Sequence, residues 1–169
     1  MSLKVLPVQT KHRLNPLTGT DMAKLILIAD DDENDLTAFR QCLKKAGAKN
    51  PVIAVDDGEK VIGYLKGEGK FENREKYPIP AILFLDLKMQ RVGGFEVMEW
   101  IRDTKFRDIL IVALSGHGEL ESVRRAYQLG ARSFLIKPCE VADMLNLMAA
   151  YSTYWDLKVP IPKPVVGKK

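Results

Sequence analysis

Four short apolar segments of this chain each end on side chains suited to metal binding or phosphoryl chemistry. If the segments are parallel strands, these side chains all lie at the carboxyl edge of one sheet, where open α/β sheets bind ligands. Three carboxylates, a hydroxyl and an ammonium group gathered there describe a metal-assisted phosphoryl site. In chain order they are Asp30 and Asp31, Asp86, Ser115 and Lys137.

The three carboxylates repel one another strongly enough to require a cation. Two carboxylates about 4 Å apart repel by roughly 4 kcal/mol at an effective dielectric near 20. All-oxygen ligands select a hard ion, and coordination completed by water and phosphate oxygens favours Mg²⁺. We expect Asp30 and Asp31 mainly to bind this metal, and Asp86 to share in metal binding and in the chemistry.

The remaining groups fit a phosphoryl transfer at Asp86. This carboxylate directly follows an apolar segment, so a strand end holds it where it can attack phosphorus and form an acyl phosphate. Ser115 precedes Gly116-His117-Gly118 and can donate its hydroxyl hydrogen to a phosphoryl oxygen. Lys137 supplies a compact positive charge that offsets the developing negative charge.

Regular alternation of strands and helices would position these groups. Apolar periodicity predicts strands near 25–29, 52–55, 81–85, 109–114 and 133–136, each followed by an amphipathic helix. Such alternation produces a parallel sheet with helices on both faces. Five units suit the flavodoxin-like, doubly wound α/β order 2-1-3-4-5. This order makes strands 1 and 3 neighbours and so brings the three aspartates together.

Size and composition indicate one folded domain. The chain has 169 residues and a mass of 19.0 kDa, with 46% hydrophobic and 28% charged residues. We expect a flexible N-terminal arm over 1–22, a domain over 23–155 and a tail over 156–169. We find no membrane span or signal peptide in the sequence. Cys42 and Cys139 form no metal-ligand spacing, and we interpret them as core thiols of a cytoplasmic protein.

The net charge of +4 does not indicate nucleic-acid binding, because of where the charges lie. Residues 1–24 and 156–169 each carry a net charge of +3, which leaves the middle of the chain at −2. Basic ends on a slightly acidic body do not form a DNA-reading face. We therefore expect neither nucleic acid nor membrane as a partner.

The joint spacing of these motifs resembles the receiver domain of two-component response regulators. The resemblance covers residues 24 to about 150. One departure is Gln90, because the family commonly has proline there, and we expect a looser loop after the acceptor. The motifs are Ile26-Leu27-Ile28-Ala29-Asp30-Asp31, Phe84-Leu85-Asp86-Leu87-Lys88-Met89 with a glycine at 93 or 94, Ala113-Leu114-Ser115, and Phe134-Leu135-Ile136-Lys137-Pro138.

The resemblance implies a role for each site residue. It makes Asp86 the acceptor of a phosphoryl group from a sensor histidine kinase, and Lys137 the phosphate-sensing lysine. Mg²⁺ would be held by Asp30, Asp31, Asp86 and the backbone carbonyl of Lys88. Ser115 and Phe134 would be the switch residues that alter the face formed by the fourth helix, fifth strand and fifth helix. Lys88 and His117 are candidates for tuning the lifetime of the acyl phosphate, and a solvated surface pair is the other interpretation.

Two additions to a minimal receiver bear on partners. A polar connection over 67–80 is long for its position, which favours a functional role. The aromatic residues Tyr151, Tyr154 and Trp155 pack either on a second subunit or on the domain's own core. Both features resemble stand-alone regulators that partner phytochrome-type histidine kinases, and we expect homodimers through the fourth and fifth helices.

Three other functions fit the sequence less well. A haloacid dehalogenase-like Mg²⁺-dependent phosphatase would use Asp30 as its nucleophile, but it leaves Asp86 without a task. A serine hydrolase lacks the required motif, because Ala113 and His117 occupy its glycine positions. A transcription factor needs an output module, and the last dozen residues are too few for one. We therefore expect a receiver-only regulator that is not an enzyme and catalyses only its own phosphorylation and dephosphorylation.

Overall fold

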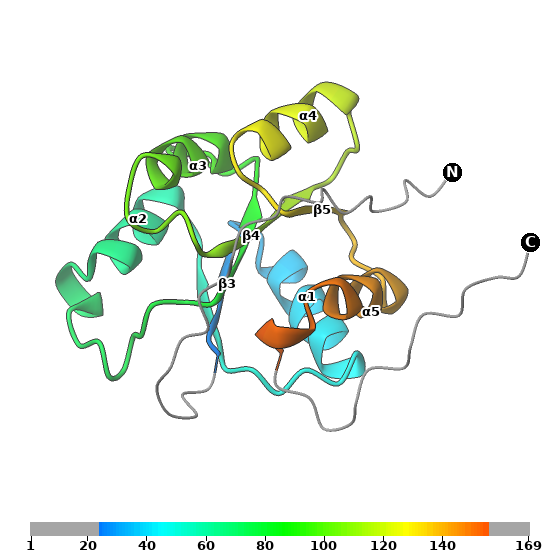
Figure 1. Cartoon of the computed structure of the whole chain (residues 1–169), viewed down its shortest axis with the longest axis horizontal. Coiled ribbons are helices and arrows are strands. Elements are labelled where there is room, and N and C mark those ends of the chain that lie inside the picture. Colours follow the sequence, from blue (N-terminus) through cyan, green and yellow to red (C-terminus); the bar gives the residue numbers. More distant parts are fainter. Residues whose placement is uncertain (1–23, 156–169) are drawn as a thin grey trace, which may run out of the picture.

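Five parallel strands form one sheet in the order β2-β1-β3-β4-β5 in the computed structural model, which describes residues 24–155 (Figure 1). The predicted order is therefore confirmed, and three strands begin one residue later than expected. Ala29 pairs with Leu85 across β1 and β3, so the residues that follow them lie side by side at one edge. The strands are β1 (Ile26–Ala29), β2 (Val52–Val55), β3 (Ile82–Asp86), β4 (Leu110–Ser115) and β5 (Ser133–Ile136).

Helices cover both faces of the sheet (Figure 1). Alternate side chains of β1 point to opposite faces: Ile26 and Ile28 pack with α1 and α5, whereas Leu27 and Ala29 pack on the other side. Both faces are buried, which explains why the strands are almost wholly apolar. The helices are α1 (Glu33–Lys45), α2 (Gly58–Lys66), α3 (Gly94–Arg102), α4 (Leu120–Gln128) and α5 (Val141–Ala150).

The start of α1 is fixed directly beside the acidic pair. The Asp32 side chain accepts hydrogen bonds from the backbone N–H groups of Asn34 and Asp35, at 2.8 and 3.2 Å. This is N-capping, in which a side-chain oxygen satisfies otherwise unpaired helix donors. The third acid of the Asp30-Asp31-Asp32 run thus begins the helix, and α1 leaves the sheet edge close to Asp30.

The long connection over 67–80 packs on its own domain. It contains a short 3₁₀ helix, η1 (Gly69–Phe71), and the Arg74 guanidinium donates to the carbonyls of Tyr64 and Leu65 at 2.8 and 2.6 Å. These carbonyls lie in the last turn of α2, where helix acceptors lack partners. These contacts give the loop a structural role, and a partner-binding role stays a prediction.

The aromatic end of the described chain covers the domain's own core. Trp155 is 6% exposed, and its ring centroid lies 6.2 Å from that of Phe84 on β3. Tyr151 donates its hydroxyl hydrogen to the Arg132 carbonyl at 2.7 Å. A second short 3₁₀ helix, η2 (Ser152–Tyr154), joins them. Of the two interpretations of this aromatic segment, packing on the core is therefore the one observed.

Two further findings concern the extent of the chain. The predicted arm over 1–22 and tail over 156–169 lie outside the described residues. Between residues 24 and 155, no helix is both long enough and apolar enough to cross a membrane.

Candidate functional site

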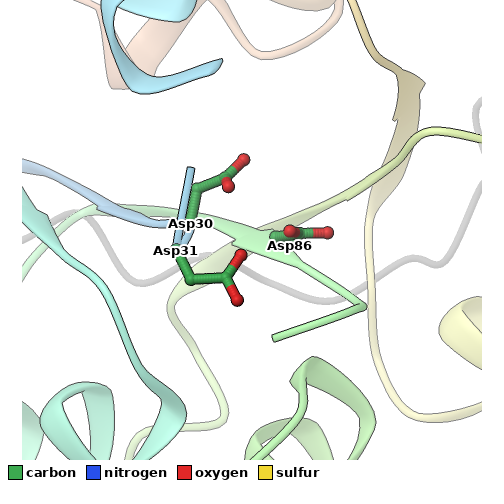
Figure 2. A group of neighbouring side chains, drawn as sticks. All are labelled: Asp30, Asp31 and Asp86. Atoms are coloured by element: carbon green, nitrogen blue, oxygen red, sulfur yellow. The ribbon is translucent and has the colours of Figure 1, made fainter. Parts of the chain in front are cut away.

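The three predicted metal-binding carboxylates come together at the ends of β1 and β3 (Figure 2). One oxygen of each of Asp30, Asp31 and Asp86 lies within 4.8 Å of the others. Asp30 and Asp86 are buried, at 2% and 3% exposure, whereas Asp31 is exposed. The cluster thus combines two buried oxygen donors with one that faces solvent.

Lys137 contacts two of these three carboxylates. Its Nζ donates to Asp30 Oδ2 at 2.8 Å and to Asp86 Oδ2 at 3.2 Å. The lysine follows β5, and its backbone N–H donates to the Ser115 carbonyl at 2.8 Å, which fixes its main chain against β4. The peptide bond between Lys137 and Pro138 is cis. Sheet pairing therefore brings together the amine and the carboxylates as the sequence predicts.

Sequence reasoning missed one member of the site, Asp35. Its Oδ2 lies 2.7 Å from the Lys137 Nζ, and Asp35 sits in the first turn of α1. An acid in a first helical turn is ordinarily explained by the helix dipole, so its position alone gave no signal. The run of acids from Asp30 to Asp35 was the available clue, because α1 begins beside the site. Three carboxylates, those of Asp30, Asp35 and Asp86, thus contact one ammonium group.

The environment shifts the pKa values of Asp86 and Lys137. Burial is the main reason that the pKa of Asp86 is raised to about 6, and the Asp30 charge adds to the rise. The Lys88 N–H and the Lys137 ammonium oppose it. Burial disfavours the charged Lys137 amine, but hydrogen bonds to Asp30 and Asp35 outweigh this effect and raise its pKa. Lys137 is therefore a permanent cation at neutral pH.

The hydroxyl and the two flanking residues lie at the same edge. Ser115 ends β4, is 3% exposed, and its Oγ accepts from the His117 N–H at 3.2 Å. The Lys88 N–H donates to Asp86 Oδ1 at 3.1 Å. Lys88 and His117 are both exposed. Their main chains therefore position the Asp86 carboxylate and the Ser115 hydroxyl, while their side chains remain open to solvent at the mouth of the site.

The loop between β3 and α3 is held at several points, which corrects the expectation of a looser loop. The Gln90 N–H donates to Asp31 Oδ2 at 3.2 Å, a hydrogen bond that proline cannot make. Arg91 has a positive φ of 63° and pairs with the buried carboxylate of Asp57 at 2.6 Å. At Gly94, an added Cβ would lie 2.4 Å from the Asp86 carbonyl oxygen. Close packing of α3 against the end of β3 therefore requires glycine there.

Phe134, the predicted aromatic switch, lies inward in this structure. It is 8% exposed and belongs to the core cluster that also contains Ala113, Ala126 and Ala131. The neighbouring Ile136, by contrast, is 39% exposed. We expected Phe134 to turn inward from an outward position, but in this structure it already lies inward. Its rotation on phosphorylation stays a prediction.

This fold and site define a class of protein. A parallel sheet with the strand order 2-1-3-4-5 is typical of a receiver domain when an acidic cluster, a hydroxyl and a lysine lie at its carboxyl edge. Residues 26–149 match the family model of the response regulator receiver domain. The chain belongs to this family and functions in two-component signalling.

Relatives place the chain near stand-alone, phytochrome-associated regulators. It is 25% identical over 140 residues to the response regulator Rcp1 of Synechocystis sp., covering 82% of this chain and 93% of that protein. The structure of the bacteriophytochrome response regulator RtBRR aligns with a TM-score of 0.72 and 34% identity, over 84% of this chain and 86% of that one. For the bacteriophytochrome response regulator AtBRR these values are 0.71 and 30%, over 81% and 98% of the two chains. The Mn²⁺-bound form of Rcp1 also aligns, at 0.65 and 25%, over 82% of this chain and 99% of that one.

The haloacid dehalogenase alternative is not supported by these findings. The family match is to receivers, and Asp30, its expected nucleophile, is buried against Lys137. Asp86, which that alternative leaves without a task, lies in the centre of the site.

Proposed function

We propose that Asp86 accepts a phosphoryl group from a sensor histidine kinase and that the chain acts as a response regulator. The observation that carries this proposal is the position of Asp86, which contacts Lys137 and shares an acidic cluster with Asp30 and Asp31. In the transfer, an Asp86 carboxylate oxygen attacks phosphorus, the bond to the histidine nitrogen breaks, and that nitrogen keeps the electron pair.

The residues present fit a divalent cation. Asp30, Asp31, Asp35 and Asp86 bring more negative charge than Lys137 can balance, and their hard oxygens suit Mg²⁺. We propose that Asp30, Asp31, Asp86 and the Lys88 carbonyl hold the ion. Bound there, Mg²⁺ would neutralise charge on the transferring phosphoryl oxygens. The relative Rcp1 has a Mn²⁺-bound form, which supports divalent-metal binding by a protein of this kind.

Lys137 and Ser115 would stabilise the transferred group. The ammonium of Lys137 offsets the negative charge that grows on the phosphoryl oxygens, and the Ser115 hydroxyl donates to one of them. Lys88 and His117 would shape the access of water to the acyl phosphate, since both side chains are open to solvent beside it. The protein would thereby catalyse only its own phosphorylation and dephosphorylation, and we propose that it does so in the cytoplasm.

The test uses acetyl phosphate as a small phosphodonor and intact-protein mass as the readout. We expect the wild type to gain one phosphoryl group with Mg²⁺ and none with a chelator present. Asp86→Asn should gain none under either condition, and Asp103→Asn, which removes an exposed carboxylate elsewhere, should behave as the wild type. Continuous turnover of phosphomonoesters without a phosphorylated protein would overturn the proposal.

We also propose that phosphorylation alters the α4-β5-α5 face and favours a homodimer through it. Two large apolar side chains are exposed on this face, Leu120 at 62% and Ile136 at 39%. Between them they offer a second copy an apolar contact. Light scattering should show a dimer in the phosphorylated wild type and a monomer in phosphorylated Leu120→Glu. If phosphorylation changes the molecular mass of neither protein in solution, the homodimer is removed from the proposal.

The phytochrome-type kinase is the proposed source of the phosphoryl group. Two of the aligned structures, RtBRR and AtBRR, are bacteriophytochrome response regulators, which supports this choice. A phosphorylated histidine kinase of that type should transfer its label to the wild type within seconds and leave Asp86→Asn unlabelled. Equal transfer from unrelated kinases would leave the receiver chemistry intact but contradict the choice of partner.

A further inference from the structure

Both cysteines of the chain lie in contact, although 97 positions separate them. Cys42 is on α1 and Cys139 follows Pro138 after β5, and their Sγ atoms are 3.6 Å apart. The two segments belong to neighbouring parts of one layer, since α1 and α5 pack side by side (Figure 1). The sulfurs would need to approach by only about 1.5 Å to reach covalent distance.

We propose that Cys42 and Cys139 form an oxidisable pair that closes to an intramolecular disulfide in the presence of hydrogen peroxide. This site goes beyond the proposed phosphoryl chemistry and does not depend on it. It adds a redox role to two residues that are core thiols, as the sequence predicts.

The two sulfurs differ in their exposure to solvent, as expected if one thiol reacts with the oxidant and the other then attacks it. Cys42 is 4% exposed, whereas Cys139 is partly exposed. A pocket of about 20 Å³ is lined by Cys139 together with Phe39, Lys137 and Pro138. Space of this size admits a water-sized molecule. We therefore expect hydrogen peroxide to reach Cys139 before Cys42, which does not line this pocket.

The reaction balances with one peroxide. Peroxide transfers one oxygen atom to the Cys139 sulfur, which becomes a sulfenic acid, and leaves as water. The Cys42 sulfur then attacks the Cys139 sulfur, the S–O bond breaks, and the departing oxygen takes up the thiol proton as a second water. The sulfur contact lowers the pKa of Cys42 and raises that of Cys139, and burial acts to raise both. The contact therefore disfavours ionisation of Cys139 for the peroxide step and favours ionisation of Cys42 for the attack.

The cross-link would tie α1 to the segment that carries Lys137. Asp35 on α1 already pairs with the Lys137 amine, and the disulfide adds a covalent tie near the same junction. Closing a loop of this length restricts the unfolded chain strongly. Oxidised protein should therefore melt about 10 °C higher than reduced protein.

The test treats the reduced full chain with hydrogen peroxide, then labels free thiols with N-ethylmaleimide. Reduced protein should take up two labels, and oxidised protein should take up none. The intact mass of the oxidised protein should be lower by two hydrogen atoms, and peptide mapping should find the two cysteine peptides joined. Dithiothreitol should restore labelling and the lower melting temperature. Cys139→Ser should melt at one temperature whether or not it is treated with peroxide, and Cys42→Ser should accumulate an oxidised Cys139 that remains unlinked.

Several results would overturn the proposal. They are two free thiols after peroxide treatment, over-oxidation of Cys139 without a cross-link in the wild type, or disulfides only between separate chains. Because the wild type itself provides the main readout, a poorly folding cysteine variant does not weaken the test. Phosphoryl uptake at Asp86 in reduced protein, measured in parallel, reports separately on the proposed function.

Discussion

Asp35 lies 2.7 Å from the Lys137 amine, nearer than either Asp30 at 2.8 Å or Asp86 at 3.2 Å. The Asp35 side chain is 39% exposed, while that of Lys137 is 16% exposed. The lysine that is expected to meet the phosphoryl group is therefore held partly by an acid on α1. In a protein phosphorylated on Asp86, as we propose, Asp35 would compete with the phosphoryl oxygens for the same ammonium.

Removing this competition should favour the phosphorylated state. We predict that Asp35→Asn raises the steady-state phosphorylated fraction at limiting acetyl phosphate, by about twofold to fivefold, as expected for a partly exposed ion pair. Phosphate-binding gel electrophoresis measures this fraction. The matched control is Asp103→Asn, which removes an equal charge at the C-terminal end of α3. A phosphorylated fraction equal to or below the control would contradict the competing role of Asp35.

The raised pKa of Asp86 predicts how stability depends on pH. A carboxyl whose folded-state pKa lies above its unfolded value stabilises the fold most below the unfolded pKa, 3.8, and this contribution is lost as pH rises through about 6. Asp86→Asn has no such loss. Its stability relative to the wild type should thus increase by about 2–3 kcal/mol between pH 4 and pH 7 in chelator. Urea unfolding at both pH values measures it, and a constant difference between the two proteins would refute the assignment.

The Gln90 N–H offers a sharp test of the loop beside the site. Gln90→Pro removes the donor to Asp31, whereas Gln90→Ala keeps it. We expect Mg²⁺ affinity about twofold to fivefold weaker in the proline variant only, the size expected for one lost hydrogen bond. Calorimetric titration with MgCl₂ supplies the measurement. Equal affinities in the two variants would show that this N–H does not orient Asp31.

Two glycines should respond to alanine with opposite signs. A Cβ at Gly94 would lie 2.4 Å from the Asp86 carbonyl oxygen, so Gly94→Ala should destabilise the fold by about 1–3 kcal/mol. Gly63 lies inside α2 with open space around it, so Gly63→Ala should stabilise by about 0.5–1 kcal/mol. Denaturant titration of both variants measures these changes in the free energy of unfolding. Similar effects in the two variants would mean that α3 does not need its close approach to Asp86.

The sequence predicted the sheet and most of the site because both follow from local patterns. Apolar segments that end in Asp30-Asp31 and Asp86 mark strand ends directly, and parallel pairing then places those residues together. Asp35 could not be predicted in this way, because its contact with Lys137 depends on how α1 packs against the sheet. The sequence leaves the place of Trp155 open for the same reason, since burial against Phe84 depends on the path of the chain after α5.

The Gln90 loop illustrates a different limit. Backbone stiffness alone predicts that a segment without the family proline is looser. In the folded protein the Gln90 N–H donates to Asp31. Arg91 has a positive φ, and its guanidinium pairs with the Asp57 carboxylate. Tertiary hydrogen bonds and ion pairs thus decide the conformation of this segment, and no local pattern reports them.

Chemical trapping distinguishes Asp86 from every other aspartate as the carrier of the phosphoryl group. Protein treated with acetyl phosphate and Mg²⁺ is reduced with borohydride, which converts an aspartyl phosphate to homoserine, and its peptides are then sequenced by mass spectrometry. We predict homoserine at position 86 and at no other aspartate. Homoserine at position 30, or an undiminished yield from Asp86→Asn, would contradict it.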